Sequence, residues 1–209
     1  MSIREIFGRS PVIPVLTISD LAQAVPLARA LIAGGLQVME ITLRTPVALA
    51  SIAAIRKAIP DAIVGVGTLT RAADFAAADR VGAQFGVAPG FTPELAAAAR
   101  GARFPLLPGV MTPSELIVAR QAGFNVLKLF PAHQAGGIEM LRTLCTPFPD
   151  ISFCPTGGIT RATAPAYLAL TNVISVGGSW VAPGELLNKA DWEGIESLAR
   201  DAASLGKLR

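Results

Sequence analysis

The sequence has a single histidine, His133, and this scarcity limits the metal chemistry that the protein can perform. One histidine cannot form the clusters that are typical of catalytic zinc sites. A magnesium site needs several convergent carboxylates, and Glu40 is the one acidic residue that the strand pattern described below turns inward. We therefore predict no metal site and no cofactor, and we expect His133 to lie in a surface loop.

Cysteines, dense basic segments and long apolar runs are also scarce. The two cysteines, Cys145 and Cys154, do not suggest a disulfide framework, so we expect free thiols in a reducing compartment. The net charge is +3 without a Lys/Arg cluster, which gives little support for nucleic-acid binding. No apolar run approaches the roughly 18 residues of a membrane span, and we see no signal peptide. We therefore predict a cytoplasmic protein that binds neither nucleic acid nor a membrane, with Cys154 as a small core residue.

Short β-rich runs alternate with alanine-rich helical runs along the whole chain. The alternation repeats about every 20–25 residues, which is the spacing of successive βα units. Eight units in 209 residues predict a single domain, residues 1–209, folded as a closed (β/α)8 TIM barrel. A doubly wound open sheet is the alternative, but no Gly-x-Gly-x-x-Gly turn follows the first strand. We expect residues 1–10 to form a short helix or arm over one end of the barrel. The predicted strands are Val12–Ile18, Val38–Leu43, Ile63–Thr68, Gln84–Pro89, Phe104–Gly109, Val126–Ala132, Ser152–Gly157 and Val173–Ser179.

Several predicted helices have recognisable ends. Thr112-Pro-Ser-Glu115 matches a capping box with proline at the first helical position, and Thr92-Pro93 opens another helix. Gly123 stands where the helix that begins after Thr112 should stop.

The second predicted strand carries polar residues on the face that a barrel turns inward. Met39, Ile41 and Leu43 form an apolar face that can pack on the helices. Glu40 and Arg44 lie on the opposite face and approach the C-terminal rim, where barrel enzymes place their chemistry. The alternative is a structural ion pair between Glu40 and Arg44, although buried ion pairs often fail to outperform apolar packing.

Lys128 lies in the sixth predicted strand, within a run that otherwise has the character of a buried strand. Residues 126–132 read Val-Leu-Lys-Leu-Phe-Pro-Ala, and their alternation places Lys128 and Phe130 on one face. Burial of an ammonium group is costly, and loss of its proton leaves a neutral amine, which is a nucleophile. Lys128 is therefore either a Schiff-base amine beside the apolar wall of Phe130 or a strand-end lysine that reaches solvent.

Glycines follow the last two predicted strands at matching positions, in Thr156-Gly-Gly-Ile159 and Val176-Gly-Gly-Ser179. Glycine-rich turns after the seventh and eighth strands of a barrel form its usual phosphate site, because backbone N–H groups can approach the anion. The alternative is a pair of tight turns. Thr68 ends the third strand with glycines leaving room beside it, although a threonine at a strand end is usually a cap or a turn residue.

An amine, a carboxylate, a guanidinium and a phosphate site at one rim suggest cleavage of a phosphorylated 2-keto acid. Lys128 would attack the ketone and form a protonated imine, which is an electron sink for breaking a C–C bond. Glu40 would transfer protons, and Arg44 would bind the substrate carboxylate bidentately. The glycine pairs would hold the phosphate.

Several segments together resemble the family of 2-keto-3-deoxy-6-phosphogluconate (KDPG) and 4-hydroxy-2-oxoglutarate aldolases. The likeness runs in order over nearly the whole chain. The segments are Glu40-Ile-Thr-Leu-Arg44-Thr, Val64-Gly-Val-Gly-Thr68, Pro108-Gly-Val-Met-Thr112-Pro-Ser-Glu, Lys128-Leu-Phe-Pro-Ala, Phe153-Cys-Pro-Thr-Gly-Gly-Ile and Gly177-Gly-Ser-Trp180.

The resemblance implies a class I, metal-independent lyase of the Entner–Doudoroff pathway that assembles as a homotrimer. It would cleave KDPG to pyruvate and glyceraldehyde 3-phosphate, and 4-hydroxy-2-oxoglutarate to pyruvate and glyoxylate. The motif from Cys154 to Gly158 fits the gluconate enzyme better than its relative acting on the galactonate epimer. The resemblance implies that Lys128 forms the imine and that Glu40 is the general acid and base. The substrate-binding residues that it implies are Arg44, Thr68, Pro89, Phe130, Thr156, Gly157, Gly158, Gly178 and Ser179.

Two other functions are compatible with part of this pattern. A phosphosugar isomerase or epimerase would keep the phosphate site and use Lys128 electrostatically, without a covalent intermediate. A non-catalytic sugar-phosphate-binding barrel would have no use for the convergence of Lys128, Glu40 and Arg44, which is an expensive set to bury.

Overall fold

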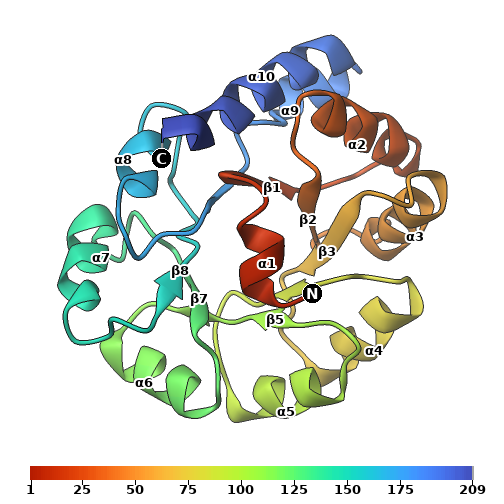
Figure 1. The fold of residues 1–209 in the computed structure, drawn as a ribbon. Coiled ribbons are helices and arrows are strands. Elements are labelled where there is room, and N and C mark those ends of the chain that lie inside the picture. Colours follow the sequence, from red (N-terminus) through yellow and green to blue (C-terminus); the bar gives the residue numbers. More distant parts are fainter. Residues whose placement is uncertain (209) are drawn as a thin grey trace.

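The computed structural model describes residues 1–208, in which short parallel strands alternate with helices. Figure 1 shows the helices as an outer ring around the strands, with the first helix lying across one end of the ring. The strands are β1 (Val12–Leu16), β2 (Val38–Thr42), β3 (Ile63–Gly67), β4 (Gly86–Val87), β5 (Leu106–Leu107), β6 (Gly109–Val110), β7 (Val126–Leu129), β8 (Ser152–Phe153) and β9 (Val176–Gly178). The helices are α1 (Ile3–Phe7), α2 (Ala24–Ala33), α3 (Ala48–Ala58), α4 (Ala72–Arg80), α5 (Pro93–Gly101), α6 (Pro113–Gln121), α7 (Gly137–Cys145), α8 (Ala164–Leu168), α9 (Gly184–Asn188) and α10 (Trp192–Ser204), with 3-10 helices η1 (Leu21–Gln23) and η2 (Leu205–Leu208). None of the helices in this range is long and apolar enough to cross a membrane.

Hydrogen bonding divides the strands into two parallel sheets. One sheet has six strands in the order β5-β4-β3-β2-β1-β9, and the other has three in the order β6-β7-β8. The six-stranded sheet is an open half-barrel whose edges lie 11 Å apart. The prediction of a closed (β/α)8 TIM barrel is therefore wrong, although the alternation of strands and helices keeps the protein in the α/β class.

The sheets separate where the strands are shortest. β5 and β6 have two residues each, and Pro108 between them has no N–H group to donate to a ladder. At the other junction, β8 and the chain before and within β9 are joined only by isolated bridges, Phe153 with Val173 and Thr156 with Gly177. The periodicity of the sequence locates the strands, but it carries no information on whether the ladder between them is continuous.

An apolar cluster fills the space inside the strands at the end that α1 covers. Ile6 and Phe7 of α1 are buried there among inward side chains of the strands, such as Ile13 and Val38. The rings of Phe7 and Phe85 meet edge to face with their centroids 5.3 Å apart. Because apolar side chains occupy this end, polar residues on the inner strand faces are left to the opposite, carboxyl end of the strands.

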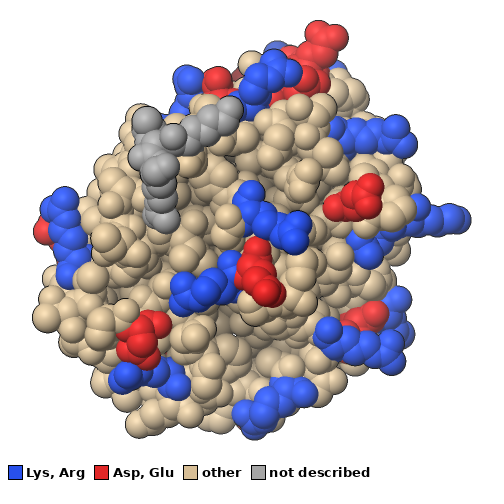
Figure 2. Space-filling view, in the orientation of Figure 1, with Lys and Arg blue, Asp and Glu red and all other residues tan. Residues whose placement is uncertain are grey.

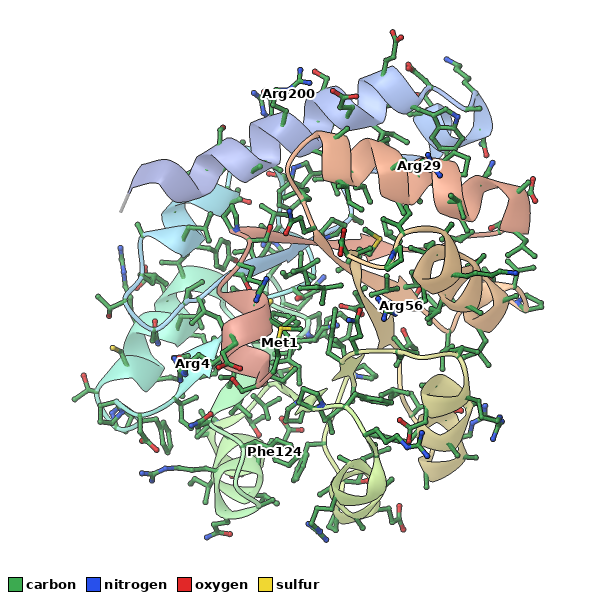
Figure 3. All side chains as sticks on the ribbon, turned by 45° about the vertical axis from the view of Figure 1, so that its right-hand side comes forward. Met1, Arg4, Arg29, Arg56, Phe124 and Arg200 are labelled. Atoms are coloured by element: carbon green, nitrogen blue, oxygen red, sulfur yellow. The ribbon has the colours of Figure 1, made fainter. Side chains whose placement is uncertain are left out.

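Polar contacts hold α1 in place. Ser2 and Glu5 form a capping box at its start, and Arg4 donates from Nη1 to the Ser152 hydroxyl at 3.0 Å. Figure 3 shows Arg4 and Met1 at this end of the molecule. On the face in Figure 2, basic and acidic side chains are interspersed rather than gathered by sign.

Candidate active site

Lys128 lies on the inner face of β7. Val126, two residues earlier on this face, belongs to the inner apolar cluster. The Lys128 side chain is only 5% exposed, and its Nζ lies 3.8 Å from Oε1 of Glu40. The same nitrogen lies 4.8 Å from the centre of the Phe130 ring. Lys128 is therefore a buried amine beside one carboxylate and one aromatic ring, and it is not a strand-end lysine that reaches solvent.

Glu40 lies on the inner face of β2, as the alternation predicts. Met39 and Ile41 pack in the outer core between strands and helices, whereas Val38 joins the inner cluster. The Glu40 side chain is 4% exposed. The space for this side chain is left by Gly67 on the neighbouring strand, because a Cβ at Gly67 would overlap Oε1 of Glu40. The bare backbone of Gly67 therefore forms one wall of the site and limits where the carboxylate can lie.

Arg44 does not continue the inner face of β2. The strand ends at Thr42, and Arg44 stands in the following turn with an exposed side chain. Thr42 is the last buried residue of that face, and its hydroxyl donates to the Leu16 carbonyl at 2.9 Å. Among the ion pairs of the described chain Glu40 is joined to Lys128, so the structural Glu40–Arg44 pair considered above is not formed. Arg44 is instead a rim residue that a ligand can reach.

Three further predicted residues follow the carboxyl ends of strands. Thr68 follows β3, Pro89 lies beyond β4, and Phe130 follows β7; all three are partly buried. Carboxyl ends of parallel strands meet at one edge of a sheet, and the contact between Lys128 and Glu40 joins the two sheets at this level. These residues thus line the end of the strands opposite α1.

The glycine-rich segment after β8 lies against β9, which contains Gly177 and Gly178. Thr156 is buried and bridges to Gly177, where a Cβ would overlap the Thr156 side chain. A Cβ at Gly178 would likewise overlap the ring of Trp180. Both glycines therefore permit close packing within the protein, a role that the Gly-Gly pattern in the sequence does not indicate.

The turn after β8 has a backbone suited to an anion site at two successive glycines. Gly157 and Gly158 have φ values of 102° and 74°, in the left-handed region that favours glycine. The N–H of His133 donates to the Gly157 carbonyl at 3.1 Å, which anchors the turn. Ser179 is exposed just after β9. His133 itself is exposed, as the sequence predicts for a surface loop.

A second polar position lies within the inner cluster below Lys128. Cys154 is 1% exposed, and its N–H donates to the Leu127 carbonyl on β7 at 2.8 Å. Burial raises the pKa of the Cys154 thiol to about 11, and the nearby Ser175 hydroxyl opposes this rise in part. The thiol is thus protonated at neutral pH, in keeping with its predicted role as a core residue.

Two cavities lie near α1, away from these residues. One of about 580 Å³ is lined by Arg9, Pro11 and Leu205, among others. The second, of about 520 Å³, is lined by residues that include Arg4 and Phe124. No predicted site residue lines either cavity. Across residues 1–208, no three His, Cys, Asp or Glu side chains are grouped so that they could hold a metal ion.

The arrangement has the components of imine chemistry. A desolvated amine can add to a carbonyl carbon, and a carboxylate beside it can move the protons that dehydration and hydrolysis require. From the sequence, the glycines of β3 are expected to leave space beside Thr68. In the structure, Gly67 instead makes room for Glu40, and a Cβ at Gly65 would overlap the Phe85 ring. The Gly-Val-Gly pattern signalled this space, but only the strand pairing shows which side chain occupies it.

Comparisons with known proteins agree with this chemistry. The profile of the family described as KDPG and KHG aldolase matches residues 3–198. A 2-dehydro-3-deoxy-phosphogluconate aldolase of Pseudoalteromonas atlantica is 45% identical over 98% of this chain and 95% of its own. A KHG/KDPG aldolase of Escherichia coli K12 is 44% identical over 99% and 97% of the two chains. The crystal structure of the KDPG aldolase of Legionella pneumophila, with pyruvate captured as a covalent carbinolamine, has a TM-score of 0.94 at 43% identity and covers 96% of this chain and 97% of its own.

Proposed function

Because the chain belongs to the KDPG and KHG aldolase family, we propose that Lys128 and Glu40 carry out its Schiff-base cleavage reaction. The enzyme is a carbon–carbon lyase that cleaves 2-dehydro-3-deoxy-6-phosphogluconate. Cleavage between C3 and C4 yields pyruvate and glyceraldehyde 3-phosphate. We propose 4-hydroxy-2-oxoglutarate as a second substrate, since the similar E. coli protein is named for both activities.

The buried contact between Lys128 and Glu40 carries this proposal. The Lys128 amine adds to the C2 ketone, and Glu40 protonates the departing hydroxyl so that water leaves and an imine forms. Glu40 then takes the proton of the C4 hydroxyl, and the C3–C4 bond breaks as its electrons move toward the iminium nitrogen. Protonation of the resulting enamine at C3 and hydrolysis by water release pyruvate and restore the amine.

The keto-acid end of the substrate is assigned to residues around this pair. Arg44 binds the carboxylate, because it is an exposed guanidinium at the rim on the same segment as Glu40. Thr68 contacts the carboxylate and its neighbouring atoms from the end of β3. Pro89 and Phe130 form apolar walls, and the 4.8 Å distance from the Phe130 ring centre to Lys128 Nζ supports this role.

The other end of the substrate is assigned to the glycine-rich turns. Thr156 contacts the C4 hydroxyl, and the phosphate binds at Gly157, Gly158, Gly178 and Ser179. The left-handed backbones of Gly157 and Gly158 support this assignment, because successive backbone N–H groups in such turns form anion-binding concavities. The phosphate would hold the reacting carbons beside Lys128.

We also propose that the protein assembles as a homotrimer in the cytoplasm. In support, Met111, Ile117 and Val118, in and just before α6, are large apolar residues with 38%, 43% and 46% exposure, and burial of such side chains against a second subunit would favour association. Sedimentation equilibrium tests the assembly: three times the chain mass supports the trimer, and the mass of one chain contradicts it.

A product assay tests the reaction. The purified enzyme is incubated with 2-dehydro-3-deoxy-6-phosphogluconate, and pyruvate and glyceraldehyde 3-phosphate are measured separately. Equal amounts of both products are expected. Conversion of the substrate to an isomer without pyruvate would favour the isomerase alternative and contradict the proposal.

A further inference from the structure

Thr68 has a backbone conformation that threonine rarely adopts. Its φ is 65°, and within residues 1–208 the one other non-glycine residue with positive φ is Ala190. A β-branched side chain in the left-handed region is a genuine outlier, and it persists only when neighbouring contacts hold it. The conformation of Thr68 therefore requires contacts that hold the backbone in place both before and after this residue.

The residues adjoining Thr68 provide two of these contacts. Leu43 donates its N–H to the Gly67 carbonyl at 2.9 Å, and Leu69 donates its N–H to the Val87 carbonyl at 3.1 Å. The Leu69 side chain is fully buried. The chain on both sides of Thr68 is thereby tied to neighbouring strands, but these contacts leave the turn into α4 to be fixed separately.

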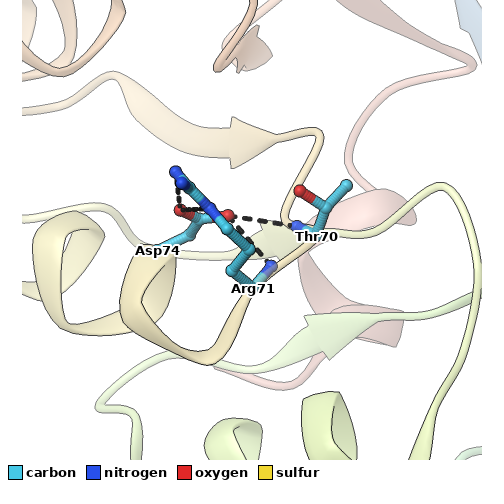
Figure 4. A network of polar contacts seen from close by, with 3 residues as sticks. All are labelled: Thr70, Arg71 and Asp74. Carbon is cyan, nitrogen blue, oxygen red and sulfur yellow. Dashed lines mark hydrogen bonds and ion pairs between the residues drawn. The ribbon is translucent and has the colours of Figure 1, made fainter.

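One carboxylate fixes that turn. Asp74 lies in the first turn of α4, and its side chain is 7% exposed. Its Oδ2 accepts the N–H groups of Thr70 at 3.2 Å and Arg71 at 3.0 Å. Its Oδ1 accepts Nε and Nη2 of Arg71 at 3.2 and 2.8 Å, as Figure 4 shows. Asp74 thus ties the residues two and three positions beyond Thr68 to the start of a helix.

The two groups of contacts differ in strength. The Arg71 side chain is 78% exposed, so water screens its ion pair with Asp74 and the pair contributes little. The bonds from the backbone N–H groups to the buried Asp74 carboxylate are charge-assisted and shielded. The backbone contacts are therefore the ones that hold the turn.

We propose that Asp74 is a positioning residue for the aldolase reaction, which holds Thr68 against the keto-acid end of the substrate. Asp74 does not touch the substrate and acts through the turn. The inference rests on the proposed function, in which Thr68 contacts the carboxylate end. It predicts that loss of Asp74 weakens binding of the keto acid while the imine-forming pair of Lys128 and Glu40 stays intact.

Borohydride trapping at increasing pyruvate concentrations tests this role, with melting temperature measured in parallel. Asp74→Ala is expected to raise the pyruvate concentration for half-maximal trapping by about 10-fold, as loss of hydrogen bonds to a charged group would. The maximal amount of trapped adduct should equal that of the wild type. Asp74→Asn keeps one acceptor oxygen, so its half-saturating pyruvate concentration should lie between those of the wild type and Asp74→Ala.

Two control variants separate positioning from general stability. Arg71→Gln removes the exposed ion pair, and its half-saturating pyruvate concentration should stay within about twofold of the wild-type value. Asp191→Ala removes another carboxylate cap, which accepts the Gly194 N–H at 2.9 Å at the start of α10. It should lower the melting temperature without changing the half-saturating pyruvate concentration.

Three outcomes would overturn the assignment of Asp74. The first is a folded Asp74→Ala variant whose half-saturating pyruvate concentration equals that of the wild type. The second is an Arg71→Gln variant in which this concentration rises as much as in Asp74→Ala. The third is an Asp74→Ala variant with less trapped adduct at saturation and an unchanged half-saturating concentration. Should Asp74→Ala not fold, wild-type half-saturation in Asp74→Asn would overturn it. Absence of trapping in the wild-type enzyme would instead contradict the proposed function, so the two failures are distinguishable.

Discussion

The Nζ atom of Lys128 lies 3.8 Å from Oε1 of Glu40 across the boundary between the two sheets. Lys128 belongs to the three-stranded sheet and Glu40 to the six-stranded sheet. The distance is longer than a hydrogen bond, so the oxygen atoms of the carboxylate remain able to accept hydrogen bonds from other groups. In the proposed reaction it contacts a hydroxyl on the carbon to which the Lys128 amine adds. This pair is the centre of the proposed reaction.

Replacement of the carboxylate tests its role in proton transfer. Glu40→Gln keeps the size of the side chain and removes the group that can exchange protons. Turnover is expected to fall by roughly 100-fold or more, while some pyruvate imine still forms and can be trapped by borohydride. The matched control is Glu139→Gln, whose side chain is exposed and pairs with Arg142. A rate within a few-fold of the wild type in Glu40→Gln would remove Glu40 as the proton shuttle.

Gly67 offers a test that leaves both reacting side chains in place. A Cβ at this position would overlap Oε1 of Glu40, so Gly67→Ala should push the carboxylate out of its position beside Lys128. We expect kcat to fall by about 10-fold or more, since misplacement of a catalytic group by about 1 Å is costly. Gly101→Ala is the matched control, because nothing lies within 4 Å of a Cβ there. Unchanged kcat in folded Gly67→Ala would show that the position of the carboxylate is not critical.

Arg44 is predicted to act on substrate binding. Its exposed side chain stands at the rim beyond β2, and removal of a charge-assisted contact to a carboxylate costs about 1.5–3 kcal/mol. Arg44→Ala should therefore raise KM for the keto acid by about 10- to 100-fold. The exposed Arg142→Ala on α7 serves as the control. If KM in Arg44→Ala equals that of the wild type, Arg44 does not bind the substrate.

Cys154 predicts a pH dependence of stability. Burial raises the pKa of its thiol from 9.0 to about 11, so the thiol is protonated in both states below pH 9. Between these values the unfolded chain loses the proton first and binds fewer protons than the folded chain. The free energy of unfolding therefore falls as pH rises from about 9 to about 11, by about 3 kcal/mol from this group.

Urea unfolding at several pH values measures this dependence. Other groups titrate in the same range, so the wild type is compared with Cys154→Ala, in which the thiol contribution is absent. The difference in unfolding free energy between the two proteins should shrink as pH rises through this window. A difference that does not change with pH would show that the thiol keeps its ordinary pKa in the folded protein.

Local patterns in the sequence predicted much of the structure. Side chains alternate along a strand, so the inner position of Glu40 and the burial of Lys128 follow from two short segments. The capping box of Thr112 and Glu115 is confirmed at the start of α6, because every contact of such a motif lies within a few residues.

Features that depend on contacts between segments escaped prediction. Closure of the barrel depends on hydrogen bonds between very short strands, and Pro108, which has no N–H group, separates the two-residue strands β5 and β6. Arg44 is expected on the inward face of the second strand, but β2 ends at Thr42 and the Arg44 side chain is exposed in the following turn. The space that Gly67 leaves for Glu40 depends on the pairing of two strands. The contacts of Asp74 were not predicted because Arg71, and not the usual Ser, Thr, Asn or Asp, stands at the N-cap of α4.

The most direct test of the account is chemical identification of the residue that binds pyruvate. The enzyme is reduced with borohydride in the presence of pyruvate, and its peptides are analysed by mass spectrometry. The account predicts a pyruvate-derived adduct on Lys128, none in folded Lys128→Ala, and an unchanged adduct in the control Lys57→Ala on α3. No adduct, or an adduct on a different lysine, would contradict a Schiff-base mechanism at Lys128.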